Sequence, residues 1–144
     1  MKRTSRIWVG ILAGAAAIVF IVARQQAIPP SSGTRSGMAI SIPDFSPAAL
    51  RGARAFEANC SKCHGVNATG TDKGPPLVHD IYNPGHHGDK AFYRAVRMGT
   101  PQHHWPFGNM PPQTQVTDKE IADIIRYIRE LQEANGIFYR PHRM

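Results

Sequence analysis

The sequence is poor in cysteine: Cys60 and Cys63 are the only two among 144 residues. Without a second pair, a zinc site built from four cysteines is excluded. A disulfide between these two residues would close a very small loop and add little stability. A redox-active dithiol is not favoured either, because nothing around the pair indicates the strand–helix–strand context of a thioredoxin-like fold. The pair therefore needs another explanation.

Acidic residues are absent from residues 1–37, which hold five of the 17 basic residues of the chain. The rest of the chain holds the other 12 basic residues and all 10 acidic ones, so its charge is nearly balanced. A domain that binds nucleic acid carries a basic surface of its own. We therefore expect no nucleic-acid partner, although the formal net charge of the whole chain is +7.

Charged and polar side chains are also absent from residues 7–23, and three basic residues precede this run. At about 1.5 Å per residue, a helix of this length is at the short end of what spans a membrane. The run is long for a signal peptide, and no cleavage site of small residues follows it. This favours a retained anchor over a cleaved signal, and we predict a membrane anchor at residues 1–24.

The basic residues before the anchor predict its orientation. Such residues stay on the cytoplasmic side, so we expect a single-pass protein of the inner membrane with its body on the periplasmic side. Residues 25–43 contain proline, serine and glycine and show no helical or strand period, which predicts a flexible linker. The remaining residues, 44–144, are expected to form one domain.

Sustained alternation of polar and apolar residues, the pattern of half-buried strands, is missing from this domain. Three segments instead carry helical signals: a helix from Ser46 and Pro47 to Cys60, a short one capped by Asp89 and ended by Gly99, and a long one with a Thr117–Glu120 capping box, ended by Gly136. The prediction is an all-α fold of about three helices with long loops. So much loop leaves a thin core, which needs a disulfide, a metal or a cofactor to stabilise it.

His64 directly follows Cys63 and completes a Cys-x-x-Cys-His motif. Two thiols one helical turn apart can bond to the two vinyl groups of one haem, and the histidine beyond them can bind its iron. The porphyrin would also supply the apolar core that the loops lack, and the predicted export suits haem attachment. The motif therefore predicts one covalent haem c, attached to Cys60 and Cys63, with His64 as an axial ligand.

Residues 45–135 resemble a class I cytochrome c. The resemblance rests on residues before the haem motif, after it and in the last helix: Gly52, Phe56, Gly74, Pro75, Leu77, Ile124, Tyr127 and Ile128. It implies a cytochrome c fold in which the first and last helices cross closely at the glycine. It also implies that the Pro75 carbonyl accepts the other ring N–H of His64 and that Leu77 packs on the haem.

The second axial ligand has seven candidates: Met98, Met110, His79, His86, His87, His103 and His104. Met98 ends a short helix, where packing in the core is its expected use. Met110 stands in a loop before two prolines, which stiffen the backbone. The methionine of class I cytochromes comes late, in such a loop before the final helix, so the resemblance implies Met110 as the ligand.

The four histidines at 86, 87, 103 and 104 have no assigned role in this interpretation. Two readings are open: a solvated loop in which one ring contacts a haem propionate, or a second metal site formed by the two adjacent pairs.

A Met/His pair fills both axial positions and favours electron transfer over substrate chemistry. We therefore expect a carrier of single electrons between redox protein partners, tethered to the membrane, with no catalytic activity and no small-molecule substrate. A cytochrome subunit fixed within a dehydrogenase or oxidase complex is the alternative. A haem enzyme or gas sensor with an open or displaceable sixth ligand is a third possibility.

Overall fold

The computed structural model describes residues 39–141. The predicted anchor, residues 1–24, lies outside the described residues, as does most of the predicted linker. Among residues 39–141 no helix is both long enough and apolar enough to cross a membrane.

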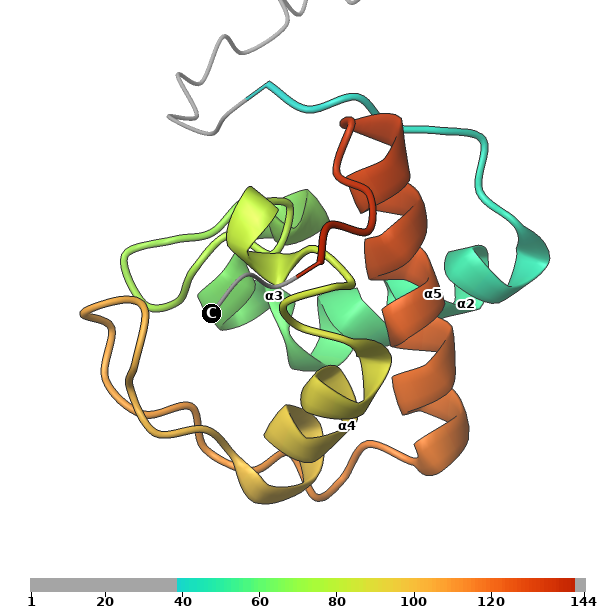
Figure 1. Cartoon of the computed structure of the whole chain (residues 1–144). Helices are drawn as coiled ribbons and strands as arrows, with labels where there is room; N and C mark the ends of the chain where they lie inside the picture. The colour runs from blue at the N-terminus through green and yellow to red at the C-terminus, as the bar shows by residue number, and fades with distance from the viewer. Residues whose placement is uncertain (1–38, 142–144) are drawn as a thin grey trace, which may run out of the picture. The chain divides into compact units, whose positions relative to one another are not determined.

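Helices and long loops make up the described part of the chain (Figure 1). Three α-helices have at least ten residues: α2 (Pro47–Asn59), α4 (Asp89–Met98) and α5 (Asp118–Ala134). The shorter elements are α3 (Ser61–His64) and the 3-10 turns η1 (Val66–Ala68) and η2 (Asp80–Tyr82). Residues 39–141 contain no β-strand, only an isolated antiparallel bridge between Thr100 and Met110. The prediction of an all-α domain with about three helices is confirmed.

The two longer helices begin where local sequence signals predict. The Ser46 hydroxyl accepts a hydrogen bond from the backbone N–H of Ala49 at 3.2 Å, and Pro47 opens α2. At the start of α5, Thr117 and Glu120 form a capping box, in which the side chain of each accepts from the backbone N–H of the other. Both beginnings are therefore determined within a few residues of sequence.

The start of α4 differs from the prediction. Asp89 does not cap this helix; Gly88 is the N-cap, and Asp89 is the first helical residue. The Asp89 carboxylate instead pairs with Arg129 of α5, with 2.9 Å between Oδ1 and Nε. A carboxylate in the first turn still favours the helix, because it faces the positive end of the helix dipole. A contact between two helices thus replaces the local cap.

The backbones of α2 and α5 touch where the two helices cross (Figure 1). A Cβ atom added to Gly52 would lie 1.9 Å from the carbonyl oxygen of Asp123, so the crossing has room only for glycine. Phe56 and Tyr127 pack beside it, with 5.6 Å between ring centroids, and Ile124 is buried. The close crossing implied by the resemblance is confirmed.

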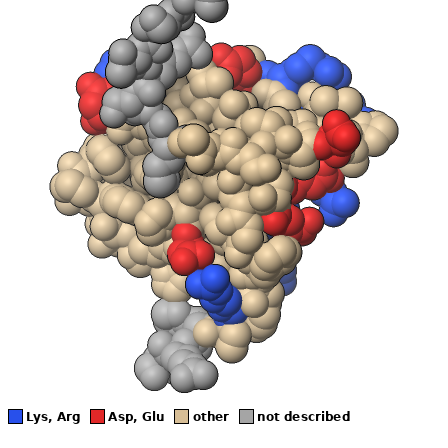
Figure 2. All heavy atoms as spheres, turned by 90° about the horizontal axis from the view of Figure 1, so that it is seen from above, with Lys and Arg blue, Asp and Glu red and all other residues tan. Residues whose placement is uncertain are grey.

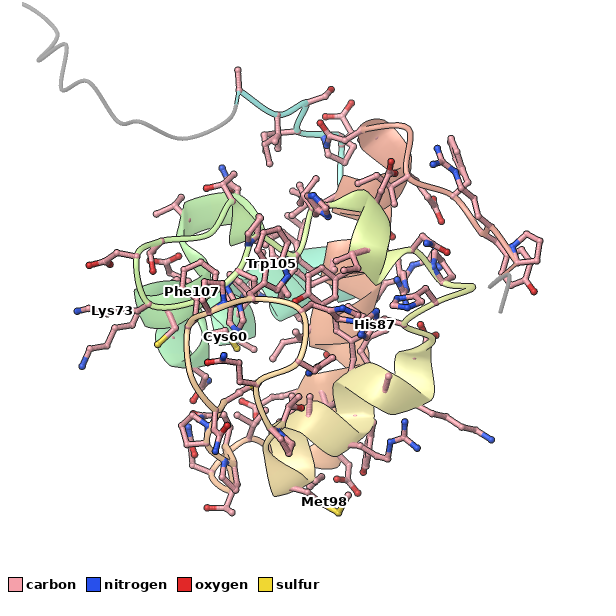
Figure 3. All side chains as sticks on the ribbon, turned by 60° about the vertical axis from the view of Figure 1, so that its left-hand side comes forward. Cys60, Lys73, His87, Met98, Trp105 and Phe107 are labelled. Atoms are coloured by element: carbon pink, nitrogen blue, oxygen red, sulfur yellow. The ribbon has the colours of Figure 1, made fainter. Side chains whose placement is uncertain are left out.

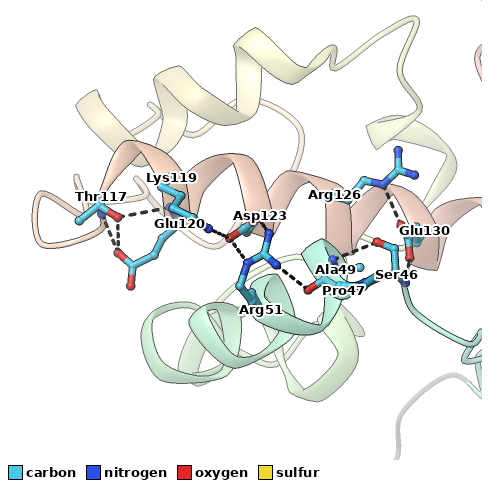
Figure 4. A network of polar contacts seen from close by, with 10 residues as sticks. All are labelled: Ser46, Pro47, Ala49, Arg51, Thr117, Lys119, Glu120, Asp123, Arg126 and Glu130. Carbon is cyan, nitrogen blue, oxygen red and sulfur yellow. Dashed lines mark hydrogen bonds and ion pairs between the residues drawn. The ribbon is translucent and has the colours of Figure 1, made fainter.

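Charged side chains near the beginning of α2 and near the beginning of α5 join these two helices (Figure 4). The Arg51 guanidinium donates two hydrogen bonds to the Asp123 carboxylate, both at 2.9 Å. Lys119 Nζ lies 2.6 Å from the same carboxylate. Hydrogen bonds from Arg51 and then from Lys119 lower the pKa of Asp123 to about 2. The carboxylate therefore stays ionised at neutral pH and keeps the pair intact.

Two polar side chains of α5 hold the loop between η1 and α4 against the helix. Gln132 is fully buried and donates to the carbonyls of Leu77 and Tyr82, at 2.9 and 3.1 Å. Arg129 donates to the carbonyls of Tyr82 and His87, at 2.8 and 2.6 Å. Buried polar groups that are satisfied in this way give a loop one preferred position.

Charged residues do not gather into one field on the face that Figure 2 shows. Small groups of basic and acidic side chains surround a broad uncharged area there. This face therefore carries separated charges around an uncharged centre, rather than a continuous basic surface.

Replacing Gly52 by alanine is expected to lower the free energy of unfolding by about 2 kcal/mol or more, because the new methyl group would overlap the Asp123 carbonyl. A guanidinium chloride titration followed by circular dichroism measures this. Arg54→Ala, at an exposed position of the same helix, is the control and should change the value by less than about 0.5 kcal/mol. Equal effects of the two variants would contradict the backbone contact.

Candidate functional site

A cavity of about 360 Å³ is bordered by residues from α2, α3, α4 and α5 and from the loops between them. Five of the six predicted site residues line it: Cys60, His64, Pro75, Leu77 and Met110. The sixth, Cys63, is exposed and is not among the lining residues. The fold therefore brings segments that are distant in sequence to one largely apolar cavity.

His64 is oriented by the backbone of the loop that follows it. Its Nδ1 lies 2.9 Å from the carbonyl oxygen of Pro75, which is the contact that the resemblance implies. A carbonyl oxygen only accepts, so Nδ1 carries the proton and Nε2 keeps the lone pair. Burial lowers the pKa of His64, and the Pro75 contact opposes this in part. The neutral ring with a free Nε2 is the form that binds a metal.

The two thiols lie at the junction of α2 and α3. Cys60 caps the end of α2 and is partly buried, whereas Cys63 is exposed, and the two form no disulfide. Burial, and then the neighbouring Cys63, raises the pKa of Cys60 to about 11. α3 continues to His64, whose backbone N–H bonds the Cys60 carbonyl at 2.9 Å. The short helix α3 and its N-cap, Cys60, thus present both thiols and the imidazole.

The loop after the motif packs against it more tightly than the sequence indicates. A Cβ atom on Gly74 would lie 2.9 Å from the carbonyl oxygen of Cys63. The Thr71 hydroxyl donates to the same carbonyl at 2.6 Å, and its backbone N–H bonds the Gly74 carbonyl at 3.0 Å. These contacts place the Pro75 carbonyl beside the His64 ring. Sequence reasoning missed the role of Thr71, which has no local signature.

Met110 is held by backbone hydrogen bonds at the base of its loop. Its N–H and carbonyl both pair with Thr100, at 2.9 and 3.0 Å, and this pairing closes residues 101–109 into a loop. Gly99 lies against the same carbonyl; a Cβ there would be 2.4 Å from the Met110 oxygen. The prolines after Met110 were the only support visible in the sequence, and the Thr100 bridge is the one that sequence reasoning missed.

Met98 does not pack in the core as expected. It is one of the residues that line the cavity, but it is 69% exposed, and Figure 3 shows its sulfur at the outer edge of the molecule. In α4 the buried side chain is Val96 instead, and Phe92 and Tyr93 are partly buried against the same core. Met98 lies on the other face of the last turn.

The histidine candidates divide into two groups. His87, His103 and His104 border the cavity, but His79 and His86 do not. The His79 ring instead packs edge-on against Trp105, with 5.1 Å between centroids, and its Nδ1 accepts from the backbone N–H of Ile81. Neither His79 nor His86 is therefore placed to serve a group inside the cavity.

Trp105 contributes an N–H donor to the cavity wall (Figure 3). Its Nε1 is buried, and no acceptor in residues 39–141 forms a hydrogen bond of normal geometry with it. Burial raises the pKa of Tyr82, and the nearby Trp105 opposes this rise in part. A buried donor of this kind suits a ligand with its own acceptors, such as the carboxylates of a haem. The residues that line the cavity therefore fit the predicted haem.

The four histidines at 86, 87, 103 and 104 form a cluster beside the cavity. Burial lowers the pKa of His87; the Ile81 carbonyl opposes this, and the neighbouring imidazoles lower the pKa further. The pKa of His104, which is exposed, is lowered too, by slight desolvation and then by the rings of His103 and His86. The neutral forms of His87 and His104 are therefore favoured.

Comparison with known proteins agrees with this geometry. A family model described as Cytochrome c matches residues 49–132, more than half of the chain and the whole Cys-x-x-Cys-His motif. No curated protein and no solved structure matches the chain significantly. The chain belongs to the cytochrome c family, whose function is electron transfer, and it carries covalently bound haem c.

Proposed function

We propose that this protein is a carrier of single electrons in which His64 and Met110 are the two axial ligands of one haem. The observation that supports it is the position of the two side chains. Both line the same cavity, His64 with its Nε2 lone pair available and Met110 with its backbone held by Thr100. The other methionine of the cavity, Met98, is mostly exposed.

The bound haem supplies a reversible one-electron couple, whose potential a histidine–methionine pair raises. The protein holds the two ligands and surrounds the porphyrin with apolar side chains that exclude water. His64 is kept in one tautomer by Pro75, which fixes the ring and raises its strength as a ligand. Two occupied axial positions leave no site for a substrate, so we propose no catalytic activity.

We propose further that residues 1–24 anchor the domain at the periplasmic face of the inner membrane through the linker. A tether keeps the domain within a limited radius, which raises its effective concentration near membrane-bound redox partners. Short-lived contacts with larger donors and acceptors fit such a carrier.

A second candidate function is that of a fixed subunit in a larger redox complex. Phe138 and Tyr139 favour it, because these neighbouring aromatic residues are 57% and 69% exposed. Large exposed aromatic side chains are common at the centres of stable interfaces.

Replacing Met110 by alanine is expected to abolish the weak near-infrared sulfur-to-iron charge-transfer band of the oxidised protein and to lower its reduction potential, because the thioether is lost. Absorption spectroscopy and a redox titration measure the two effects. Met98→Ala is the matched control, and its band should be unchanged. Absence of the band from the wild type would support an open or histidine-ligated site and refute the proposal.

Replacing Gly99 by alanine is expected to weaken the same band, because a Cβ would push on the Met110 carbonyl and disrupt the Thr100 bridge. Gly108→Ala is a matched control. Its φ is also positive, +83° against +75°, but a Cβ there would meet nothing within 4 Å. Both glycines thus have a positive φ, but only at Gly99 would a Cβ meet the Met110 loop. If both variants lose the band equally, the bridge does not position Met110.

Purification of the full-length chain from membranes in a mild detergent separates the free carrier from the fixed subunit. The carrier is expected to appear in the membrane fraction and to elute without a stoichiometric partner. A partner that stays bound in wild type but dissociates in the double variant Phe138→Ser, Tyr139→Ser would favour the subunit instead. Recovery in the soluble periplasmic fraction would refute the anchor.

A further inference from the structure

Three histidines from two separate segments meet beside the haem cavity. His86 and His87 lie in the turn after η2, and His104 lies in the loop closed by Thr100 and Met110. One ring nitrogen of each lies within 4.8 Å of the other two. We infer that His86, His87 and His104 form a binding site for a transition-metal ion that prefers imidazole, with Cu(II) bound more tightly than Zn(II).

The Ile81 carbonyl makes the contact that orients metal-binding histidines. Its oxygen lies 2.7 Å from Nδ1 of His87 and 2.9 Å from Nδ1 of His86. Metal-binding imidazoles commonly use their second ring nitrogen to donate to a backbone carbonyl in this way. The two Nδ1 atoms are also 2.8 Å apart, so the two rings meet at one point of the turn.

The composition of the group selects the kind of ion. It contains imidazole nitrogens only, with neither a thiolate nor a carboxylate. Imidazole suits copper and zinc, whereas magnesium and calcium require oxygen ligands. Among divalent ions of the first transition row, Cu(II) binds such ligands most tightly. Three protein ligands also leave room for water or another small ligand on the ion.

The backbone of the turn does not need these rings to hold it in place. The Asn83 side chain accepts from the backbone N–H groups of Gly85 and His86, at 2.9 and 3.2 Å. The His87 carbonyl accepts from the buried Arg129 at 2.6 Å. Two of the ligands therefore stand on a rigid support, and an ion would join His104, with the Met110 loop, to that support.

His103 provides a matched control within the same loop. Its ring lies 4.3 Å from that of His104, centroid to centroid, but it is outside the group of three. Its Nδ1 lies 2.8 Å from the Pro101 carbonyl. Like His104, it is exposed, so glutamine at either position is compatible with the fold.

The test uses the full-length, haem-loaded protein purified without a polyhistidine tag. Equilibrium dialysis against Cu(II) or Zn(II), followed by elemental analysis, measures bound metal per haem. We expect one ion per haem, and Cu(II) should displace Zn(II). His104→Gln and His86→Gln should each weaken binding by about tenfold or more, and His103→Gln by less than about twofold. The electron paramagnetic resonance spectrum of the Cu(II) form should show coupling to ligand nitrogens.

No bound ion in the wild type would overturn the inference. So would an equal loss of affinity in His103→Gln, since it would indicate loose binding to a histidine-rich surface. The haem absorption spectrum and circular dichroism of each variant verify that the protein is folded. Because binding is counted by elemental analysis, the result does not depend on whether Met110 is the axial ligand.

Discussion

The close crossing of α2 and α5 at Gly52 is the contact on which the site depends. It fixes the direction of α2, and therefore the position of α3 with the two thiols and the imidazole of His64. On the other helix, Arg129 and Gln132 hold the loop that carries Leu77 and the histidine turn. A displacement of either helix by the width of one methyl group would change both walls of the haem cavity.

The cavity is held mainly by backbone contacts rather than by a large core. The Pro75 carbonyl fixes the His64 ring, the Thr100 bridge fixes Met110, and Gly99 leaves space for that bridge. Loops that bond to each other in this way can present ligands without regular secondary structure around them. The haem then fills the volume that a domain of this size cannot fill with its own side chains.

Local sequence rules predicted the features that depend on neighbouring residues. The Ser46 and Thr117 caps and the Cys-x-x-Cys-His motif are of this kind, and Ser46 and Thr117 cap helices as predicted. The errors came from contacts between distant residues. Asp89 pairs with Arg129 instead of capping, and Met98 lies on the exposed face of α4. The Thr100 bridge and the meeting of two histidine pairs have no local signature, because they arise only when the loops are in place.

We propose that the Met110 sulfur would bind the haem iron together with His64. The proton NMR spectrum of the reduced full-length protein tests it most directly, because the porphyrin ring current shifts the methyl group of an axial methionine far upfield. We predict one three-proton resonance well upfield of all other methyl signals, absent from Met110→Ala and present in Met98→Ala. A wild-type spectrum without that resonance, or its persistence in Met110→Ala, would contradict the account.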